Sequence, residues 1–173
     1  MFRKISQLVL IIIFATTLVA CSAPIASYDN GIINITPTIG WNIMSPNKSN
    51  APIVVMNYTD KAQITITKKT FNENIDSQTF INQNIAQAEK LPNYQNISIK
   101  KTQISNQKTT INTFKAQVDQ NTTNTFIQTY FVQNKNTYII TAIASENADK
   151  TIQREILKVI NKIKFNKEET TNP

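Results

Sequence analysis

The residues able to act as nucleophiles or metal ligands are few in this chain. Cys21 is the single cysteine among 173 residues, and histidine is absent. Histidine is the commonest general base and the commonest metal ligand of proteins. Ser-His-Asp catalysis, Cys-His catalysis and the usual zinc sites are therefore excluded. The strongest nucleophile left is the thiol of Cys21, and its chemistry depends on the segment around it.

The segment before Cys21 has the order of a secretory signal peptide. Arg3 and Lys4 give a charged start, an apolar stretch runs from Leu8 to Ala20, and small residues mark the cleavage point. This stretch is shorter than the roughly 20 residues that a membrane-spanning helix needs. Two alternatives stay open: a transmembrane anchor that is never cleaved, and an ordinary signal that is cut after Ala20 and leaves a plain thiol.

The tetrapeptide Leu18-Val19-Ala20-Cys21 resembles the lipobox of bacterial lipoproteins. The resemblance implies cleavage before Cys21 and attachment of lipid to its thiol and its new amino group, which makes a stable membrane anchor. It also accounts for a lone cysteine in an exported protein. Ser22 follows the cysteine and implies sorting to the outer membrane, with the domain facing the periplasm. The inner membrane and the cell surface are the alternatives.

This interpretation divides the chain into four segments. They are a cleaved signal peptide at 1–20, a lipidated tether at 21–30, a globular domain at 31–165 and a polar tail at 166–173. A domain of that size can bury a hydrophobic core of its own.

The charge balance is basic but not that of a nucleic-acid-binding protein. The net charge is +7, and loss of Arg3 and Lys4 with the signal peptide lowers it to +5. The lysines are scattered, with adjacent pairs at Lys68-Lys69 and Lys100-Lys101, and no basic stripe is interleaved with aromatic residues. We therefore expect no nucleic-acid partner. A basic exported domain could contact anionic lipid or polysaccharide surfaces.

Alternating apolar and polar residues predict a series of strands. These are expected at residues 32–35, 53–58, 63–69, 97–104, 111–118, 123–133 and 138–144. The last four form an antiparallel meander, because only short turns separate them. The turns Asp119-Gln120-Asn121 and Asn134-Lys135-Asn136 contain no glycine. Asn and Asp tolerate positive φ best among the other residues, so we expect them to form these turns.

Helical spacing of apolar residues predicts two helices. The first begins at an N-cap formed by Asp76 and ends at Leu91-Pro92, because proline disfavours helix in the residue before it. Its apolar stripe is modest. The second has a continuous stripe formed by Ile152, Ile156, Val159, Ile160 and Ile163.

Two pairs of neighbouring strand residues indicate how these elements pack. Tyr130 and Phe131 point to opposite faces of their strand, and so do Ile139 and Ile140. Both faces of the sheet therefore need cover. The sequence predicts an α+β fold in which an antiparallel sheet of about six to seven strands has helices on both faces, an α/β/α sandwich.

Three local features resemble PsbP-like domains, a family that includes the extrinsic photosystem II protein and DcrB-like envelope lipoproteins. They are the strand and Pro-x-x-Gly-Trp turn of residues 32–41, the helix from Phe80 to Leu91, and the strand from Tyr138 to Ala144 that leads into the final helix. The resemblance implies the α/β/α sandwich predicted above. It also implies a binding or assembly role rather than catalysis. The metal-binding histidines of some photosynthetic members have no counterpart here.

Four aromatic residues are candidates for a partner or ligand surface: Trp41, Tyr58, Tyr94 and Tyr130. Trp41, the only tryptophan, would be an exposed anchor in one reading and would close the end of the core in the other. The tyrosines would line a groove in one reading and be half-buried residues in the other. We predict no catalytic residue, no metal site and no cofactor.

These observations favour a non-catalytic envelope lipoprotein. Its lipid on Cys21 would hold it to the membrane, and its periplasmic domain would bind an envelope protein in an assembly, stability or secretion accessory role. The alternative is a carrier or sensor of an apolar ligand such as a lipid. An enzyme is a third possibility and would need two converging carboxylates. Six acids lie between the first predicted strand and the second predicted helix: Asp60, Glu73, Asp76, Glu89, Asp119 and Glu146.

Overall fold

The computed structural model describes residues 24–25, 27–44, 52–120, 122–148 and 150–166. The predicted signal peptide at 1–20, the lipid-attachment residue Cys21 and nearly all of the polar tail lie outside these residues. The predictions about them stay predictions.

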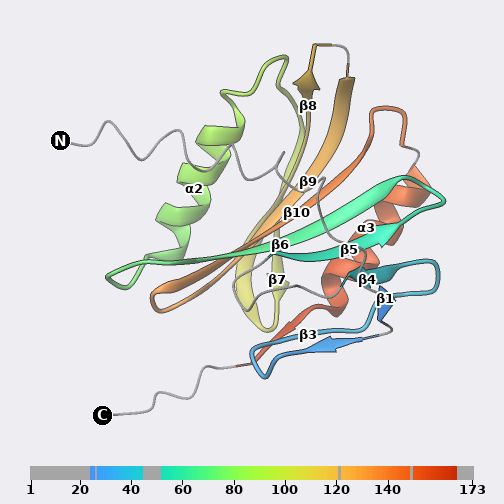
Figure 1. The fold of residues 1–173 in the computed structure, drawn as a ribbon. Helices are drawn as coiled ribbons and strands as arrows, with labels where there is room; N and C mark the ends of the chain where they lie inside the picture. Colours follow the sequence, from blue (N-terminus) through green and yellow to red (C-terminus); the bar gives the residue numbers. More distant parts are fainter. Residues whose placement is uncertain (1–23, 26, 45–51, 121, 149, 167–173) are drawn as a thin grey trace.

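Two helices and a series of strands make up the described residues (Figure 1). The helices are α2 (Ser77–Ala88) and α3 (Lys150–Lys162). The longer strands are β5 (Ile53–Asn57), β6 (Ala62–Thr70), β7 (Gln95–Ile104), β8 (Gln107–Asp119), β9 (Thr122–Gln133) and β10 (Asn136–Ser145). The short strands are β1 (Pro24–Ile25), β2 (Tyr28–Asp29), β3 (Ile33–Ile35), β4 (Asn42–Met44) and β11 (Lys164–Phe165).

The strands form two antiparallel sheets. An eight-stranded sheet has the order β1-β4-β5-β6-β10-β9-β8-β7, and a small sheet has the order β11-β3-β2. The predicted α+β class and the predicted meander are confirmed, because β7 to β10 are consecutive neighbours. Four short strands, β1, β2, β4 and β11, were not predicted, since two or three residues are too few to show an alternation. Two of them, β1 and β2, fall within the predicted tether, so folded structure begins before residue 31.

The turns agree with the expectation that asparagine would replace glycine. Asn134 has a φ of 55° in the turn between β9 and β10, and Asn106 has a φ of 65° in the turn between β7 and β8. Asn121 lies outside the described residues. Gly40 has a φ of 87° just before Trp41, a conformation that L side chains rarely adopt. A glycine is therefore needed there for its backbone rather than for space.

The main core lies between the eight-stranded sheet, α3 and the small sheet. It contains Ile64, Ile140 and Ile156 together with Ile33 and Phe165, all buried. The predicted apolar stripe of α3 is confirmed, since Ile152, Ile156, Val159 and Ile160 are buried on it. We call this side of the sheet the α3 face.

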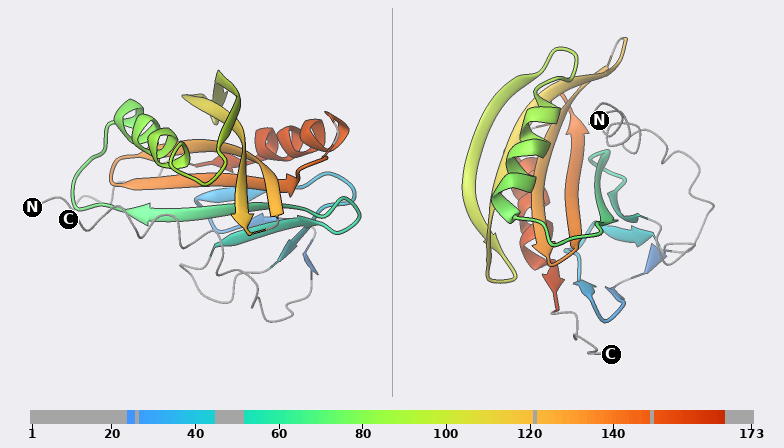
Figure 2. Two further views of the ribbon diagram at one scale, coloured as in Figure 1. Left: turned by 90° about the horizontal axis from the view of Figure 1, so that it is seen from above. Right: turned by 90° about the vertical axis from the view of Figure 1, so that its left-hand side faces the viewer.

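The opposite side of the sheet, the α2 face, is covered by α2. Phe80 and Ile81 of α2 pack with Tyr130 and Val132 of β9, and Ala88 packs near Phe114 of β8. Figure 2 shows the outer strands β7 and β8 rising between the two helices, with one helix on each side. The prediction that Tyr130 and Phe131 point to opposite faces of the sheet is confirmed, because Tyr130 packs with α2 whereas Phe131 lies in the main core.

The start of α2 is set by the predicted cap. Asp76 has extended backbone angles, and its Oδ1 accepts a hydrogen bond of 2.7 Å from the N–H of Thr79. The helix ends at Ala88, before the predicted boundary at Leu91-Pro92, because the next N–H groups, those of Lys90 and Leu91, bond to carbonyls three residues back instead of four. The Thr79 N–H holds the pKa of Asp76 below its usual range.

We expect Asp76→Ala to lower the melting temperature at neutral pH, because an unsatisfied N–H then opens the first turn of α2. The folded pKa of Asp76 is depressed, so its contribution is present above the unfolded pKa near 3.9 and is lost as the pH falls through the folded value. The two proteins should therefore converge in acid. Circular dichroism melts between pH 7 and pH 2.5 measure this, with the exposed Glu73→Ala as control. If the melting temperature of Asp76→Ala stayed equally far below that of the unaltered chain at pH 2.5, the loss of stability would not come from the ionised cap.

Candidate functional site

The four aromatic candidates do not come together. Trp41 is 5 % exposed and belongs to the main core, and Tyr130 is 1 % exposed beneath α2. Tyr94 is half-buried and packs on the Phe114 ring with centroids 5.3 Å apart. Tyr58 is 58 % exposed and donates a hydrogen bond to Met44 Sδ at 3.4 Å. Of the four, Tyr58 alone is a surface residue, and it has no aromatic companion in this set.

The two tyrosines on the α2 face are also unsuited to acid–base chemistry. Burial raises the pKa of Tyr130 and also that of Tyr94. Both hydroxyls therefore stay protonated at neutral pH. Sequence reasoning missed the polar row beside them: Gln128 Nε2 donates to Thr141 Oγ1 at 3.2 Å, and the Tyr130 hydroxyl donates to Gln128 Oε1 at 3.3 Å. These side chains bond to one another within the fold.

The carboxylates are dispersed over the domain, and several of them already bond to a partner within the fold. Asp76 caps α2, Asp60 accepts a hydrogen bond from Asn57 Nδ2 at 2.9 Å, and Glu146 lies 3.6 Å from the Lys115 ammonium. Across the part of the chain that the structure describes, no three Asp, Glu, His or Cys residues are grouped so that they could hold a metal ion. No helix in these described segments is both long enough and apolar enough to span a bilayer.

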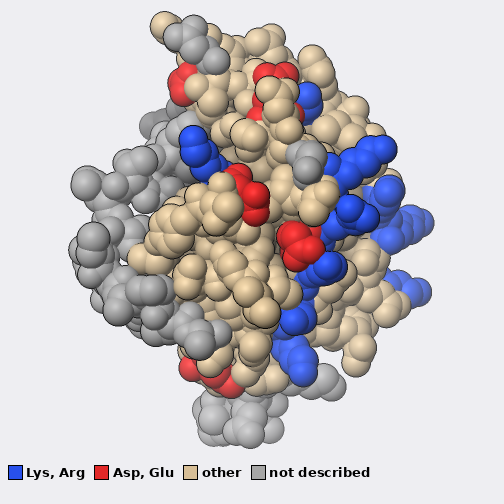
Figure 3. Space-filling model, turned by 90° about the vertical axis from the view of Figure 1, so that its right-hand side faces the viewer, with Lys and Arg blue, Asp and Glu red and all other residues tan. Residues whose placement is uncertain are grey.

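The outward side of α3 carries a row of cations. Lys150, Arg154 and Lys158 recur every four residues, so they lie along one side of the helix, away from its buried isoleucines. Figure 3, which views this side of the molecule, shows Lys and Arg side chains gathered in a band with few carboxylates among them. This row could have been recognised in the sequence from the four-residue spacing of Lys150, Arg154 and Lys158, although the lysines of the chain as a whole are scattered.

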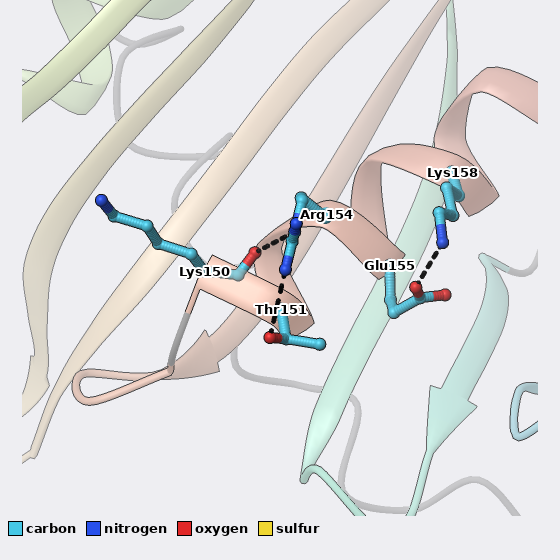
Figure 4. A network of polar contacts seen from close by, with 5 residues as sticks. All are labelled: Lys150, Thr151, Arg154, Glu155 and Lys158. Carbon is cyan, nitrogen blue, oxygen red and sulfur yellow. Dashed lines mark hydrogen bonds and ion pairs between the residues drawn. The ribbon is translucent and has the colours of Figure 1, made fainter.

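Polar contacts along the helix orient two of these cations, Arg154 and Lys158 (Figure 4). Arg154 Nε donates to the Lys150 carbonyl at 3.2 Å, and its Nη2 donates to Thr151 Oγ1 at 3.4 Å. Lys158 Nζ lies 2.7 Å from Glu155 Oε1. Within the described residues no carboxylate pairs with Lys150 or Arg154.

A surface hollow of about 380 Å³ lies beside the first two turns of α3, next to Lys150 and Arg154. Its lining consists of Lys150, Gln153, Arg154 and Leu157, which share one side of the helix at spacings of three and four residues. Most of this lining is carbon, because the stems of the polar side chains contribute it together with half-buried Leu157. The site therefore combines two cationic groups with an apolar floor.

Comparisons with known proteins bear on the fold. No family model and no curated protein sequence matches the chain. Among solved structures, LpqN of Mycobacterium tuberculosis, described as involved in cell envelope biogenesis, is similar with a TM-score of 0.58 and 16 % identity over 82 % of this chain and 88 % of that one. A Pseudomonas aeruginosa protein of unknown function has a TM-score of 0.52 and 10 % identity over 81 % and 89 %.

A cyanobacterial structure connects the fold to a family. PsbP (CyanoP) of Synechocystis has a TM-score of 0.52 and 12 % identity over 86 % of this chain and 99 % of that one. Identities this low establish the fold alone. The chain therefore has a PsbP-like fold.

Proposed function

We propose that this chain is a non-catalytic accessory lipoprotein of the bacterial cell envelope, and that its domain binds a partner protein through α3. The observation that carries the proposal is the row of cations on α3 (Figure 4) beside an apolar hollow. Its complement is an acidic surface with an apolar centre, which is typical of a protein partner. The likeness to LpqN, itself described in envelope biogenesis, agrees with this class of role.

The proposal places the domain at the periplasmic side of the outer membrane. The support is the Leu18-Val19-Ala20-Cys21 lipobox followed by Ser22. Metabolic labelling with palmitate tests it. The full chain should incorporate label and fractionate with the outer membrane, and Cys21→Ser should do neither. Label that is retained by Cys21→Ser would contradict lipidation at this residue.

Charge reversal on α3 tests the partner site. We expect Lys150→Glu combined with Arg154→Glu to weaken recovery of a cross-linked envelope partner about tenfold or more, because both attractive contacts become repulsive. Lys61→Glu with Lys135→Glu is the matched control, since it changes the net charge equally on two turns elsewhere. The measurement is quantitative mass spectrometry of proteins cross-linked to the full chain. An equal loss in the control, or no reproducible partner with the unaltered chain, would contradict the proposal.

The same variants should keep their fold. Lys150 lies at the first described residue of α3, where the helix macrodipole disfavours a cation. Lys150→Glu alone is therefore expected to raise stability slightly, by ~0.3–1 kcal/mol. Urea unfolding measures this, and a clear loss of stability instead would show that Lys150 supports the fold.

The second candidate function is transport or sensing of an apolar ligand. The carbon-lined hollow beside α3 favours it, since about 380 Å³ falls within the range of small-ligand pockets. The hollow is open along the helix surface, so it shields an acyl chain less well than a protein partner would. Native mass spectrometry of the purified chain distinguishes the two, because a carrier should retain a bound lipid.

A further inference from the structure

The strand at one end of the eight-stranded sheet offers a free edge. β7 is the last strand in the order, and its ten residues pair with β8 from Gln95↔Lys115 to Ile104↔Gln107. In an antiparallel strand every second residue points its N–H and C=O away from the neighbouring strand. Among the described residues no strand pairs with the outer side of β7. A row of backbone donors and acceptors therefore faces outward.

Apolar side chains accompany this edge. Ile97 is 49 % exposed and Ile99 is 48 % exposed, which places them among the few large hydrophobic residues on the described surface. Proteins usually protect a long edge strand with charges, proline, bulges or a short length. β7 has a bulge between Asn96 and Ser98 and two exposed lysines, Lys100 and Lys101, yet it is long and keeps two exposed isoleucines. Main-chain groups and apolar side chains are the two contacts that an added strand uses.

The charges on β7 select between possible occupants. Lys100 and Lys101 are exposed neighbours, so their side chains lie on opposite faces of the strand. A second copy of this chain, paired along the full strand, would bring four lysines to neighbouring cross-strand positions, which is destabilising. An added strand that alternates acidic with apolar residues has its Asp or Glu side chains beside Lys100 on one face. Its apolar side chains lie beside Ile99 on the other face, which Lys101 shares. The charges on β7 therefore disfavour pairing with a second copy of this chain and favour pairing with an acidic segment.

We propose that β7 is the docking edge for an extended acidic segment of a partner protein, which joins the eight-stranded sheet as an additional strand. The segment alternates apolar with acidic residues, with the apolar ones beside Ile97 and Ile99. The inference rests on the proposed partner-binding function and names a second contact surface, separate from the cations of α3.

The test uses a defined peptide probe. A ten-residue peptide that alternates valine with glutamate is added to the full chain labelled with ¹⁵N, and amide hydrogen exchange is followed residue by residue. We expect exchange to slow at alternate residues of β7, those whose N–H points outward, and to stay unchanged in α2 and α3. A peptide that alternates valine with lysine should have no effect.

Two variants make the result specific. Lys100→Glu with Lys101→Glu should weaken binding of the valine–glutamate peptide about tenfold and create binding of the valine–lysine peptide. Ile97→Thr with Ile99→Thr should weaken binding of the valine–glutamate peptide while keeping the charges. Lys61→Glu with Lys135→Glu is the control for net charge and should leave binding unchanged.

Three outcomes would overturn the inference. They are no binding of the valine–glutamate peptide, binding without protection of β7 amides, and self-association of the full chain through β7 in sedimentation experiments. None of these affects the cross-linking result for α3, so this inference can fail while the proposed function stands. Conversely, β7 can bind the peptide even if the α3 variants recover the partner unchanged.

Discussion

Phe165→Ala is expected to lower the free energy of unfolding by about 3–5 kcal/mol, the usual loss for a large aromatic residue removed from a core. Phe165 is 7 % exposed, and its ring stacks on Phe131 with centroids 4.1 Å apart and an interplanar angle of 8°. It also contacts the Tyr138 ring at 4.9 Å. The substitution leaves a cavity where the small sheet meets the main core.

The measurement is urea unfolding followed by the fluorescence of Trp41, which belongs to the same core. Lys164→Ala is the control, because it changes an exposed neighbour and keeps the backbone pairing of β11 with β3. A loss below about 1 kcal/mol for Phe165→Ala would mean that the C-terminal strand is not part of the cooperative core.

Phe80→Ala should lower the free energy of unfolding by about 3 kcal/mol or more. Its effect should be concentrated in α2, not spread over the main core. Phe80 is 4 % exposed, and its ring meets Phe71 and Tyr130 edge to face, each at 6.1 Å. It is the largest buried side chain of α2, whose other buried residues are Ile81 and Ala88. We therefore expect α2 to detach from the sheet before the rest of the domain unfolds.

Hydrogen exchange detects this detachment. In Phe80→Ala the amides of α2 should lose protection while those of β9 and β10 keep most of theirs. Gln83→Ala, an exposed change on the same helix, should leave both groups protected. Simultaneous loss of protection in α2 and β10 would show that the two faces of the sheet unfold as one unit.

The part of the fold that could be predicted from the sequence consists of long segments in which apolar residues recur at a regular spacing. The alternation around Tyr130 and Phe131 and the isoleucine stripe of α3 each extend over ten residues or more, so they predict burial on both faces correctly. Asp76 was predictable because capping is a local hydrogen bond. The strands β2 and β11 were not, because two residues are too few to show a periodic pattern, and β11 in addition pairs with a strand far away in the sequence.

The candidate site was harder to predict, for a physical reason. Aromatic residues such as Trp41 and Tyr130 have the right chemistry for a core and for a surface, and only tertiary packing decides between the two. The cations of α3 show the reverse case. Each is an ordinary exposed residue, and the row becomes visible once the buried side of the helix is known.

The pairing of β11 with β3 also determines when the domain can finish folding. Lys164 pairs with Asn34, and Asn166 Nδ2 donates to the Gly31 carbonyl across a sequence separation of 135 residues. During synthesis the apolar strand Ile33–Ile35 is therefore made early and waits for a partner made last. Such distant contacts slow folding, because the entropy of closing the long loop between them is lost before the contacts form.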